Sequence, residues 1–309
     1  GFRRNEVKTV YMAPVSTPSD WMHDRLWKTY VNDKISVLDN VSVYAGVMAE
    51  GNRFTGTALS PRTSLVYMAK KDHAFRATYA RAHRTPSFYE DRVYYLYDYT
   101  IDFGTGDVTS YIEQGNSQLE KETVDAYELG YKGSFLEHKA DVNIEAYHNE
   151  ITHLITLYNA GIHYKGVSPL GVGRYYEKIY IYNNSNKAMV NGVEVSIEYS
   201  PVKWLKLFSN YTWQSIDDKK EIYKAYAPAH KYHGGTRVTL DRGFSANVLF
   251  SYIDRIVDKQ TEPIESISGD VPIQAYYKLD VRLAQSFFDG ALEVAFIGLN
   301  LLESKHYEF

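Results

Sequence analysis

Long stretches of this sequence alternate between apolar and polar side chains, and the alternation is clearest in residues 141–147, 192–199, 244–252 and 278–283. Successive side chains of a β-strand point to opposite faces of its sheet, so each stretch is predicted to be a strand with one apolar face. The other face carries charged Glu, Asp, Lys and Arg residues in mid-strand. The chain is therefore constrained to a sheet with one apolar face and one polar, charged face.

The same pattern predicts twelve strands, with ends defined to within about 2–4 residues. They cover residues 22–35, 39–49, 58–70, 73–84, 120–132, 137–157, 177–199, 203–215, 230–240, 244–256, 274–287 and 291–302, and residues 1–11 form a candidate thirteenth. Many of these exceed the usual soluble range of roughly 3–10 residues. Tilted strands that cross a hydrocarbon layer and project beyond it would have this length.

The connections between the predicted strands alternate in length. Short turns are expected at residues 70–72, 133–137, 200–202, 241–243 and 288–290, and long ones at 49–57, 85–118, 159–174, 216–228 and 257–273. Short turns at one end and long loops at the other are typical of bacterial outer-membrane barrels. We therefore predict an all-β fold, an antiparallel transmembrane β-barrel.

Composition excludes several other classes of protein. The 309 residues contain no cysteine and no run of 18 apolar residues, which excludes disulfides and a transmembrane helix. The net charge of −4 provides no basic field for nucleic acid. Tyrosine is unusually abundant, with 29 Tyr against 13 Phe and 4 Trp. Its apolar ring and polar tip suit a membrane–water boundary or a ligand-binding loop.

Two motifs lie on either side of a long, tyrosine-rich segment: Arg84-Thr-Pro-Ser-Phe88 at the end of one predicted strand, and Tyr127-Glu-Leu-Gly-Tyr-Lys132 in the next. They closely resemble the turn and the returning strand of a signature of TonB-dependent outer-membrane receptors. Further similar segments are Leu59-Ser-Pro-Arg62, Asn191-Gly-Val-Glu194, Tyr277-Lys-Leu-Asp280 and Gly298-Leu-Asn-Leu-Leu302. The Asn-Pro-x-Leu-x-Pro-Glu element of the family is matched only in part here, by Asn116-Ser-Gln-Leu-Glu-Lys-Glu122.

The resemblance implies a barrel of roughly 22 strands, of which residues 1–309 supply about 12–13 as one incomplete domain. We expect about eight or nine further strands and a plug domain before Gly1, and a closing strand after Phe309. A complete smaller barrel of twelve strands is the alternative.

The resemblance also implies a function. The chain would belong to an active-transport receptor, not an enzyme, that binds a scarce nutrient at its outer loops and imports it with energy from TonB. A ferric siderophore is the expected cargo, ahead of cobalamin and haem, and residues 87–115 contain no histidine to bind haem. The expected partners are the TonB complex, through the missing plug, and outer-membrane lipid. No cofactor and no nucleic acid are expected.

Two tyrosine-rich loops hold the candidate binding residues. Aromatic rings and a guanidinium on long outer loops suit a ferric siderophore, which they would hold by stacking, hydrogen bonds and charge. The alternative is that some of these tyrosines belong to the aromatic girdle at the membrane boundary. The candidates are Tyr89, Arg92, Tyr94, Tyr95, Tyr97, Tyr99, Tyr164, Arg174, Tyr175 and Tyr176.

No metal or catalytic site is predicted. His230 and His233 are three residues apart, so in a strand they point to opposite faces and do not chelate one ion. No nucleophile elbow, phosphate loop or zinc helix motif occurs. The competing interpretations are a passive porin or small stand-alone outer-membrane barrel, an outer-membrane lipase or protease, and a soluble tyrosine-rich β-sandwich adhesin.

Overall fold

The computed structural model describes residues 2–8, 21–218, 227–258 and 271–302, and nearly all of its strands belong to one large sheet. The strands are β1 (Phe2–Lys8), β2 (Trp21–Leu38), β3 (Val41–Asn52), β4 (Gly56–Lys70), β5 (His73–Arg84), β6 (Tyr94–Asp102), β7 (Asp107–Gln114), β8 (Glu122–Phe135), β9 (Ala140–Val167), β10 (Arg174–Val202), β11 (Leu205–Asp218), β12 (His230–Thr239), β13 (Phe244–Ile253), β14 (Ile256–Asp258), β15 (Val271–Ile273), β16 (Tyr276–Phe287) and β17 (Leu292–Gly298). One short α-helix, α1 (Phe88–Arg92), and a 3-10 turn, η1 (Phe288–Gly290), complete the elements.

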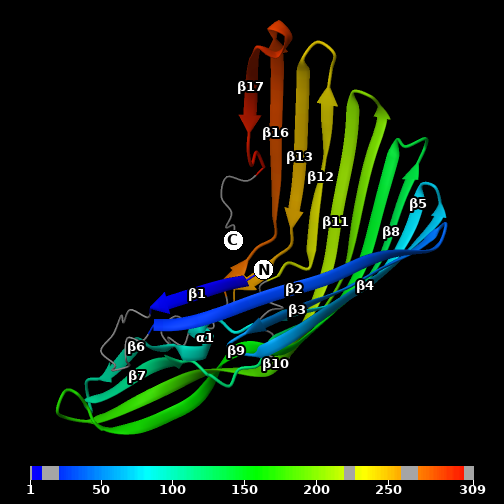
Figure 1. The fold of residues 1–309 in the computed structure, drawn as a ribbon. Helices are drawn as coiled ribbons and strands as arrows, with labels where there is room; N and C mark the ends of the chain where they lie inside the picture. Colours follow the sequence, from blue (N-terminus) through cyan, green and yellow to red (C-terminus); the bar gives the residue numbers. More distant parts are fainter. Residues whose placement is uncertain (1, 9–20, 219–226, 259–270, 303–309) are drawn as a thin grey trace.

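The main sheet follows the order of the chain. Its path is β1-β2-β3-β4-β5-β8-β9-β10-β11-β12-β13-β16-β17, with every neighbouring pair antiparallel. The sheet is strongly curved, and β6, β7 and the ends of β9 and β10 extend beyond it at one end (Figure 1). All twelve predicted strands and the candidate thirteenth, β1, are present, so the predicted all-β, partial-barrel fold is confirmed.

The strand register separates the two faces that the alternation predicts. One row of register partners across five strands is entirely apolar, running Leu65, Ala77, Leu129, Ala146, Val193. Leu129 and Leu65 in this row are 65% and 47% exposed, so the described residues leave this part of the apolar face uncovered. The structure therefore has the exposed apolar wall that a lipid environment requires.

The adjacent row of the sheet is charged. Arg76 Nη2 in β5 lies 3.5 Å from Glu128 Oε2 in the neighbouring strand β8 and 2.6 Å from Glu145 Oε1 in β9, one strand further on. We refer to the two sides as the apolar face and the polar face of the wall. Ion pairs between adjacent strands on the polar face balance charges that would repel if all were acidic.

The sequence prediction was wrong at three connections on the long-loop end. Only residues 53–55 join β3 to β4, where a loop over 49–57 was expected. The expected loop over 159–174 is mostly strand, because β9 continues to Val167 and β10 starts at Arg174. The expected loop over 85–118 contains α1, β6 and β7. In all three places backbone pairing continues past the wall. The expected loops at 216–228 and 257–273 lie partly outside the described residues, which include β14 and β15.

Within the described residues, no helix has the length and apolar character needed to cross a membrane.

Replacing Leu129 with arginine places a charge in the middle of the apolar face, and we expect a loss of about 2–4 kcal/mol in the free energy of unfolding in lipid. The matched control is Ser196→Arg, which adds the same charge to the polar face. Denaturant titration of the membrane-inserted protein, followed by its heat-modifiable gel mobility, measures both. Equal losses for the two variants would contradict the assignment of the faces.

Candidate functional site

The two tyrosine-rich segments form a single four-stranded sheet beyond the wall. We call it the extension: β6, β7, residues 158–167 of β9 and residues 174–181 of β10. β6 pairs antiparallel with β7, β7 pairs parallel with β10, and β10 pairs antiparallel with β9. The β7–β10 ladder begins at Val108 opposite Tyr175 and ends at Gln114 opposite Ile181. Residues separated by more than sixty positions in the sequence therefore share one surface.

Arg84 connects the extension to the wall. Its guanidinium bonds both carboxylate oxygens of Glu90 in α1, at 3.0 and 2.9 Å, and contacts Glu122 at the start of β8. Glu122 Oε1 also accepts the backbone N–H of Ile155 at 2.8 Å. Although burial opposes it, the hydrogen bonds from Arg84 and Ser87 hold the pKa of Glu90 below its ordinary value. The result is a charged junction of β5, α1, β8 and β9.

The helix itself is short and needs local stabilisation. Ser87 caps α1 by accepting the backbone N–H of Glu90, and the Glu90 side chain accepts the N–H of Ser87, which is a capping box. The tip between β3 and β4 supports α1 from the other side, where the Phe54 and Phe88 rings lie 5.0 Å apart, edge to face. Asn52 Nδ2 donates to Thr85 Oγ1 at 3.0 Å. Contacts within residues 85–90 and with the β3–β4 tip thus fix where the extension begins.

The register divides the extension into two faces. The Lys178 face carries Thr109, Tyr111, Glu113, Tyr176, Lys178 and Tyr180, and the Glu177 face carries Val108, Ser110, Ile112, Tyr175, Glu177 and Ile179. Ile112 is 1% exposed and Tyr111 is 6% exposed, so both faces are covered near β7. The candidate tyrosines divide between these faces.

The Lys178 face contains a cluster of tyrosine rings around a cation. Tyr97 lies at the bulge of β6, and its ring centroid is 6.1 Å from Tyr111 and 6.3 Å from Tyr180. Lys178 Nζ lies 5.4 Å from the Tyr111 ring centroid and 5.8 Å from that of Tyr180. Tyr95 joins this face opposite Glu113 in the register. Tyr111 is buried beneath this cluster, and the half-buried rings of Tyr97 and Tyr180 with the Lys178 ammonium group provide the chemistry suited to an anionic, aromatic ligand.

Glu113 links this cluster to the helix. It accepts a hydrogen bond from Tyr89 Oη of α1 at 2.8 Å and another from Tyr182 Oη. Burial, followed by the bond to Glu113, raises the pKa of both Tyr89 and Tyr182 well above the ordinary tyrosine value. Both phenols are therefore neutral hydrogen-bond donors at physiological pH.

A second group on the Lys178 face lies toward the far end of the extension. The Tyr164 and Tyr176 rings meet edge to face across β9 and β10, with centroids 5.9 Å apart. Arg174 Nη1 lies 3.4 Å from Tyr176 Oη, and the Arg174 backbone N–H donates to Asp107 Oδ1 at 2.7 Å. Tyr164 is 63% exposed, so its ring is available to a ligand.

The remaining candidates lie elsewhere. The register places Tyr94, Tyr99 and Tyr175 on the Glu177 face. There Tyr175 Oη lies 3.4 Å from Glu177 Oε1, and Lys165 Nζ pairs with Glu177 Oε2 at 2.8 Å. Burial and the nearby Glu177 raise the pKa of Tyr94.

Arg92 is an exposed residue of α1 whose Nε lies 2.6 Å from Asp91 Oδ2. Its guanidinium is therefore paired within the helix, apart from the ring contacts that define the Lys178 face.

Sequence reasoning did not select Lys178, Tyr180, Tyr182 or Glu113 as site residues. A signal for three of them was present, because Tyr176, Lys178, Tyr180 and Tyr182 recur at every second position and so share a strand face. Glu113 gave no such signal, since only the parallel pairing of β7 with β10 brings it to these tyrosines.

The described residues show no arrangement suited to holding a metal ion, because no group of three or more His, Cys, Asp or Glu side chains gathers within them. The His230 and His233 side chains have separate partners, Tyr211 at 2.7 Å and Ser251 at 2.9 Å. The site offers rings, hydroxyls and charges for binding.

Comparison with known proteins identifies a family. The family described as "TonB dependent receptor-like, beta-barrel" matches residues 2–300. A curated relative, the probable TonB-dependent siderophore receptor PirA of Acinetobacter baumannii, is 22% identical over 250 residues, which cover 77% of this chain and 32% of PirA. The chain thus spans about a third of the length of this relative.

Solved structures share the fold. The siderophore receptor PirA from Acinetobacter baumannii superposes with a TM-score of 0.70 at 17% identity, covering 89% of this chain and 41% of that one. A mutant of the ferric enterobactin receptor PfeA from Pseudomonas aeruginosa, in complex with enterobactin, gives 0.75 at 17% identity, covering 93% and 41%. At these identities the likeness concerns the fold alone.

Substitution of Arg84 by alanine should loosen the extension, because Glu90 and Glu122 then lose their shared cation. We expect limited proteolysis to cut within residues 86–121 at least several-fold faster than in the wild type. The control is Arg81→Ala, which changes another arginine of β5. It removes two hydrogen bonds from Arg81 to Asp125, each 2.8 Å long. Faster cutting in both variants, or in neither, would show that Arg84 does not anchor the extension.

Replacement of Glu113 by glutamine removes the negative charge beside two phenols while preserving the side-chain shape. We expect the pKa values of Tyr89 and Tyr182 to fall toward the ordinary value of about 10. In the wild type the neutral phenols contribute stability below about pH 10, and this contribution declines as pH rises toward their raised folded pKa values. Tyrosinate absorbance measured between about pH 9 and 12 should therefore rise earlier in the variant. The control Glu137→Gln, in a short turn, should titrate like the wild type, and a Glu113→Gln curve that matches it would contradict the assignment.

Proposed function

This chain belongs to the TonB-dependent receptors, as a portion of their β-barrel, and from that premise we propose that it forms part of the wall and outer loops of an outer-membrane receptor that imports a ferric siderophore. The observation that carries the proposal is the Lys178 face, where tyrosine rings from β7 and β10 lie beside an ammonium group and a ring from β6 packs against both of them. The apolar face of the wall would contact lipid, and the extension would project outside the cell.

The chemistry of the Lys178 face fits a ferric catecholate or a similar chelate. Such a chelate presents flat rings and carries negative charge, so its rings would stack on Tyr97 and Tyr180 while Lys178 attracts the charge. Tyr95 would add a hydroxyl donor at the edge, Tyr89 would support Glu113 through its hydrogen bond, and Tyr164, Arg174 and Tyr176 would form a second contact area further out. Two relatives support this cargo class by their names, a siderophore receptor and a receptor solved with enterobactin.

Under this proposal the candidate tyrosines on the Glu177 face do not contact the cargo. Tyr94 and Tyr175 lie beside the Lys165–Glu177 ion pair, in which the lysine is already paired with a carboxylate and so offers less attraction to an anionic cargo. We assign Tyr94, Tyr99 and Tyr175 to the structure of the extension and keep Arg92 as an exposed cation at its base. The binding surface therefore occupies one side of the extension only.

Transport, under the same proposal, uses energy from outside this chain. TonB would act on a plug domain to open the path, as the family membership suggests, while the barrel segment supplies the binding loops and the polar lumen wall. The chain would perform no bond chemistry. Its polar face, with Arg76 between Glu128 and Glu145, would line the lumen against the plug.

The test is a pair of alanine variants in the whole receptor. We expect Tyr97→Ala with Lys178→Ala to weaken binding of ferric enterobactin about tenfold or more, because a ring contact of about 0.5–1.5 kcal/mol and a cation are both lost. Tyr99→Ala with Tyr175→Ala, on the Glu177 face, should change the affinity less than threefold. Intrinsic fluorescence quenching by the iron complex measures the dissociation constants.

Uptake of radioactive iron in cells provides the second readout. Deleting TonB should abolish uptake by the wild-type receptor while leaving binding at the cell surface intact. Equal weakening by both pairs of variants would contradict the proposed binding face, and uptake that persists without TonB would contradict the proposed transport mechanism.

A further inference from the structure

The β9–β10 pair is irregular where it leaves the wall and becomes the extension. Between the register pairs Asn183–Thr156 and Ala188–Ile151, first β10 and then β9 carries one extra residue, after which the regular ladder resumes. Bulges of this kind bend the strands that contain them. In Figure 1 the pair changes direction on its way from the wall to the extension. We call the residues between these two register pairs the joint.

An asparagine side chain spans the joint. Asn184, in the part of β10 that has the extra residue, donates from Nδ2 to the backbone carbonyl of His153 in β9 at 2.6 Å. His153 has a φ of 57°, a left-handed conformation that residues other than glycine adopt at a cost. Such a conformation persists only where the surrounding contacts enforce it. Asn184 therefore holds β9 at the point where the strand departs from regular geometry.

The same side chain binds a third segment of the chain. Glu120 donates its backbone N–H to Asn184 Oδ1 at 2.7 Å, and the Glu120 carbonyl accepts from Asn184 Nδ2 at 3.0 Å. This pair of bonds takes the place of the two bonds that opposed backbone groups exchange in a regular antiparallel ladder. Glu120 belongs to residues 115–121, which connect β7 to β8 and which we call the strap. Asn184 therefore joins β9, β10 and the strap.

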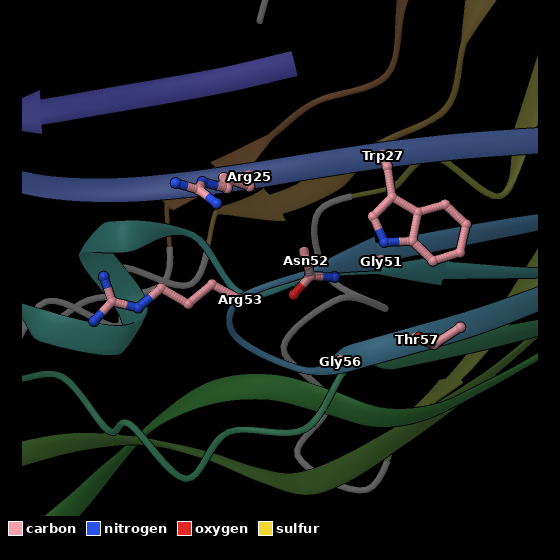
Figure 2. A pocket seen from close by; sticks show the side chains of 7 residues that line it. All are labelled: Arg25, Trp27, Gly51, Asn52, Arg53, Gly56 and Thr57. Carbon is pink, nitrogen blue, oxygen red and sulfur yellow. The ribbon is translucent and has the colours of Figure 1, made fainter. Parts of the chain in front are cut away.

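The strap also contacts the extension and the wall on either side of the joint. Asn116 donates from Nδ2 to the Tyr182 carbonyl at 3.0 Å, on the extension side. Lys121 donates from Nζ to the Thr57 carbonyl at 3.0 Å, on the β3–β4 tip of the wall, where Thr57 is labelled in Figure 2. Leu119, between these two contacts, is 5% exposed. The strap thus bridges the extension and the wall beside the joint.

We propose that Asn184 is a positioning residue for the Lys178 face: its amide holds the strap and β9 together and thereby fixes the angle between the extension and the wall. The joint interrupts the regular ladder that would otherwise fix this angle, so the amide bonds take over that role. Arg84 anchors the extension through α1, whereas Asn184 acts on β10, to which β7 is paired. An extension free to swing would lose conformational entropy on each binding event. The proposal rests on the proposed function only in naming the Lys178 face as the surface that is positioned.

The same substitution at two neighbouring asparagines tests the proposal in the whole receptor. Asn184→Asp keeps the acceptor, but it removes both donated bonds and places a carboxylate against two carbonyl oxygens. Asn183→Asp is the matched control, because the described contacts of Asn183 use Oδ1 alone, as the acceptor from the Ser185 N–H at 3.2 Å and the Ser185 hydroxyl at 2.7 Å. Aspartate preserves those two bonds.

Double electron–electron resonance measures the angle as a distance between two spin labels. One label is attached at Phe103→Cys, in the turn between β6 and β7, where the native side chain is 92% exposed. The other is attached at Ser215→Cys, an exposed position of β11 in the wall. The chain contains no cysteine of its own, so within residues 1–309 the labels attach at these two positions alone.

We expect the distance distribution to broaden about twofold in Asn184→Asp, because the joint loses two hydrogen bonds and gains a repulsive contact. The affinity for ferric enterobactin, measured on the same samples, should fall about threefold or more, because binding must then order the extension. Asn183→Asp should match the wild type in both measurements. An unchanged distribution in Asn184→Asp, equal broadening in the control, or broadening without loss of affinity would overturn the proposal.

Heat-modifiable gel mobility confirms folding of each variant. If Asn184→Asp fails to fold, Asn116→Asp takes its place and should broaden the distribution in the same way, because it loses the bond to Tyr182 and keeps the bond from the Gln118 N–H. A wild-type receptor that does not bind ferric enterobactin would contradict the proposed function. The distance distributions would then still decide whether Asn184 fixes the extension.

Discussion

Backbone hydrogen bonding between neighbouring strands is the constraint on which the rest of this structure depends. A wall that meets lipid has no water to satisfy its N–H and C=O groups, so each strand must be paired along its length. The antiparallel pair β9 and β10 meets this requirement in the wall and then continues past it, from Tyr199 opposite Ala140 to Arg174 opposite Val167. The proposed binding surface is built on this continuation, because β10 provides the edge that β7 joins in parallel.

Pairing the extension onto a wall strand gives the proposed binding surface a rigid support. A loop of the same composition would have to lose conformational entropy each time it bound a ligand. Here Tyr97, Tyr111 and Tyr180 are held by three strands, Arg84 ties the base of the extension to β8, and Glu113 orients two further phenols. The cost of ordering these rings is met during folding, which would leave more of the contact energy for the proposed cargo.

Much of the wall could be predicted from the sequence, because period-2 alternation is a direct consequence of strand geometry. Leu129 and Glu128 fall on opposite faces as their parity requires, and the strand on each side continues the pattern. The extension was harder to predict. Residues 94–97 read Tyr-Tyr-Leu-Tyr with no alternation, and a bulge at Tyr97 shifts the register there. The parallel contact between β7 and β10 joins distant segments, and no local signal marks it. For that reason the tyrosines were found by composition, whereas their division between two faces and the roles of Lys178 and Glu113 needed the fold.

The most direct test of this account is the structure of the whole receptor with a ferric siderophore bound. The account predicts iron density beside the Lys178 face, with the chelate rings against Tyr97 and Tyr180 and the Lys178 ammonium facing its charged oxygens. Density against the Lys165–Glu177 pair, or in the lumen with the Lys178 face empty, would contradict it.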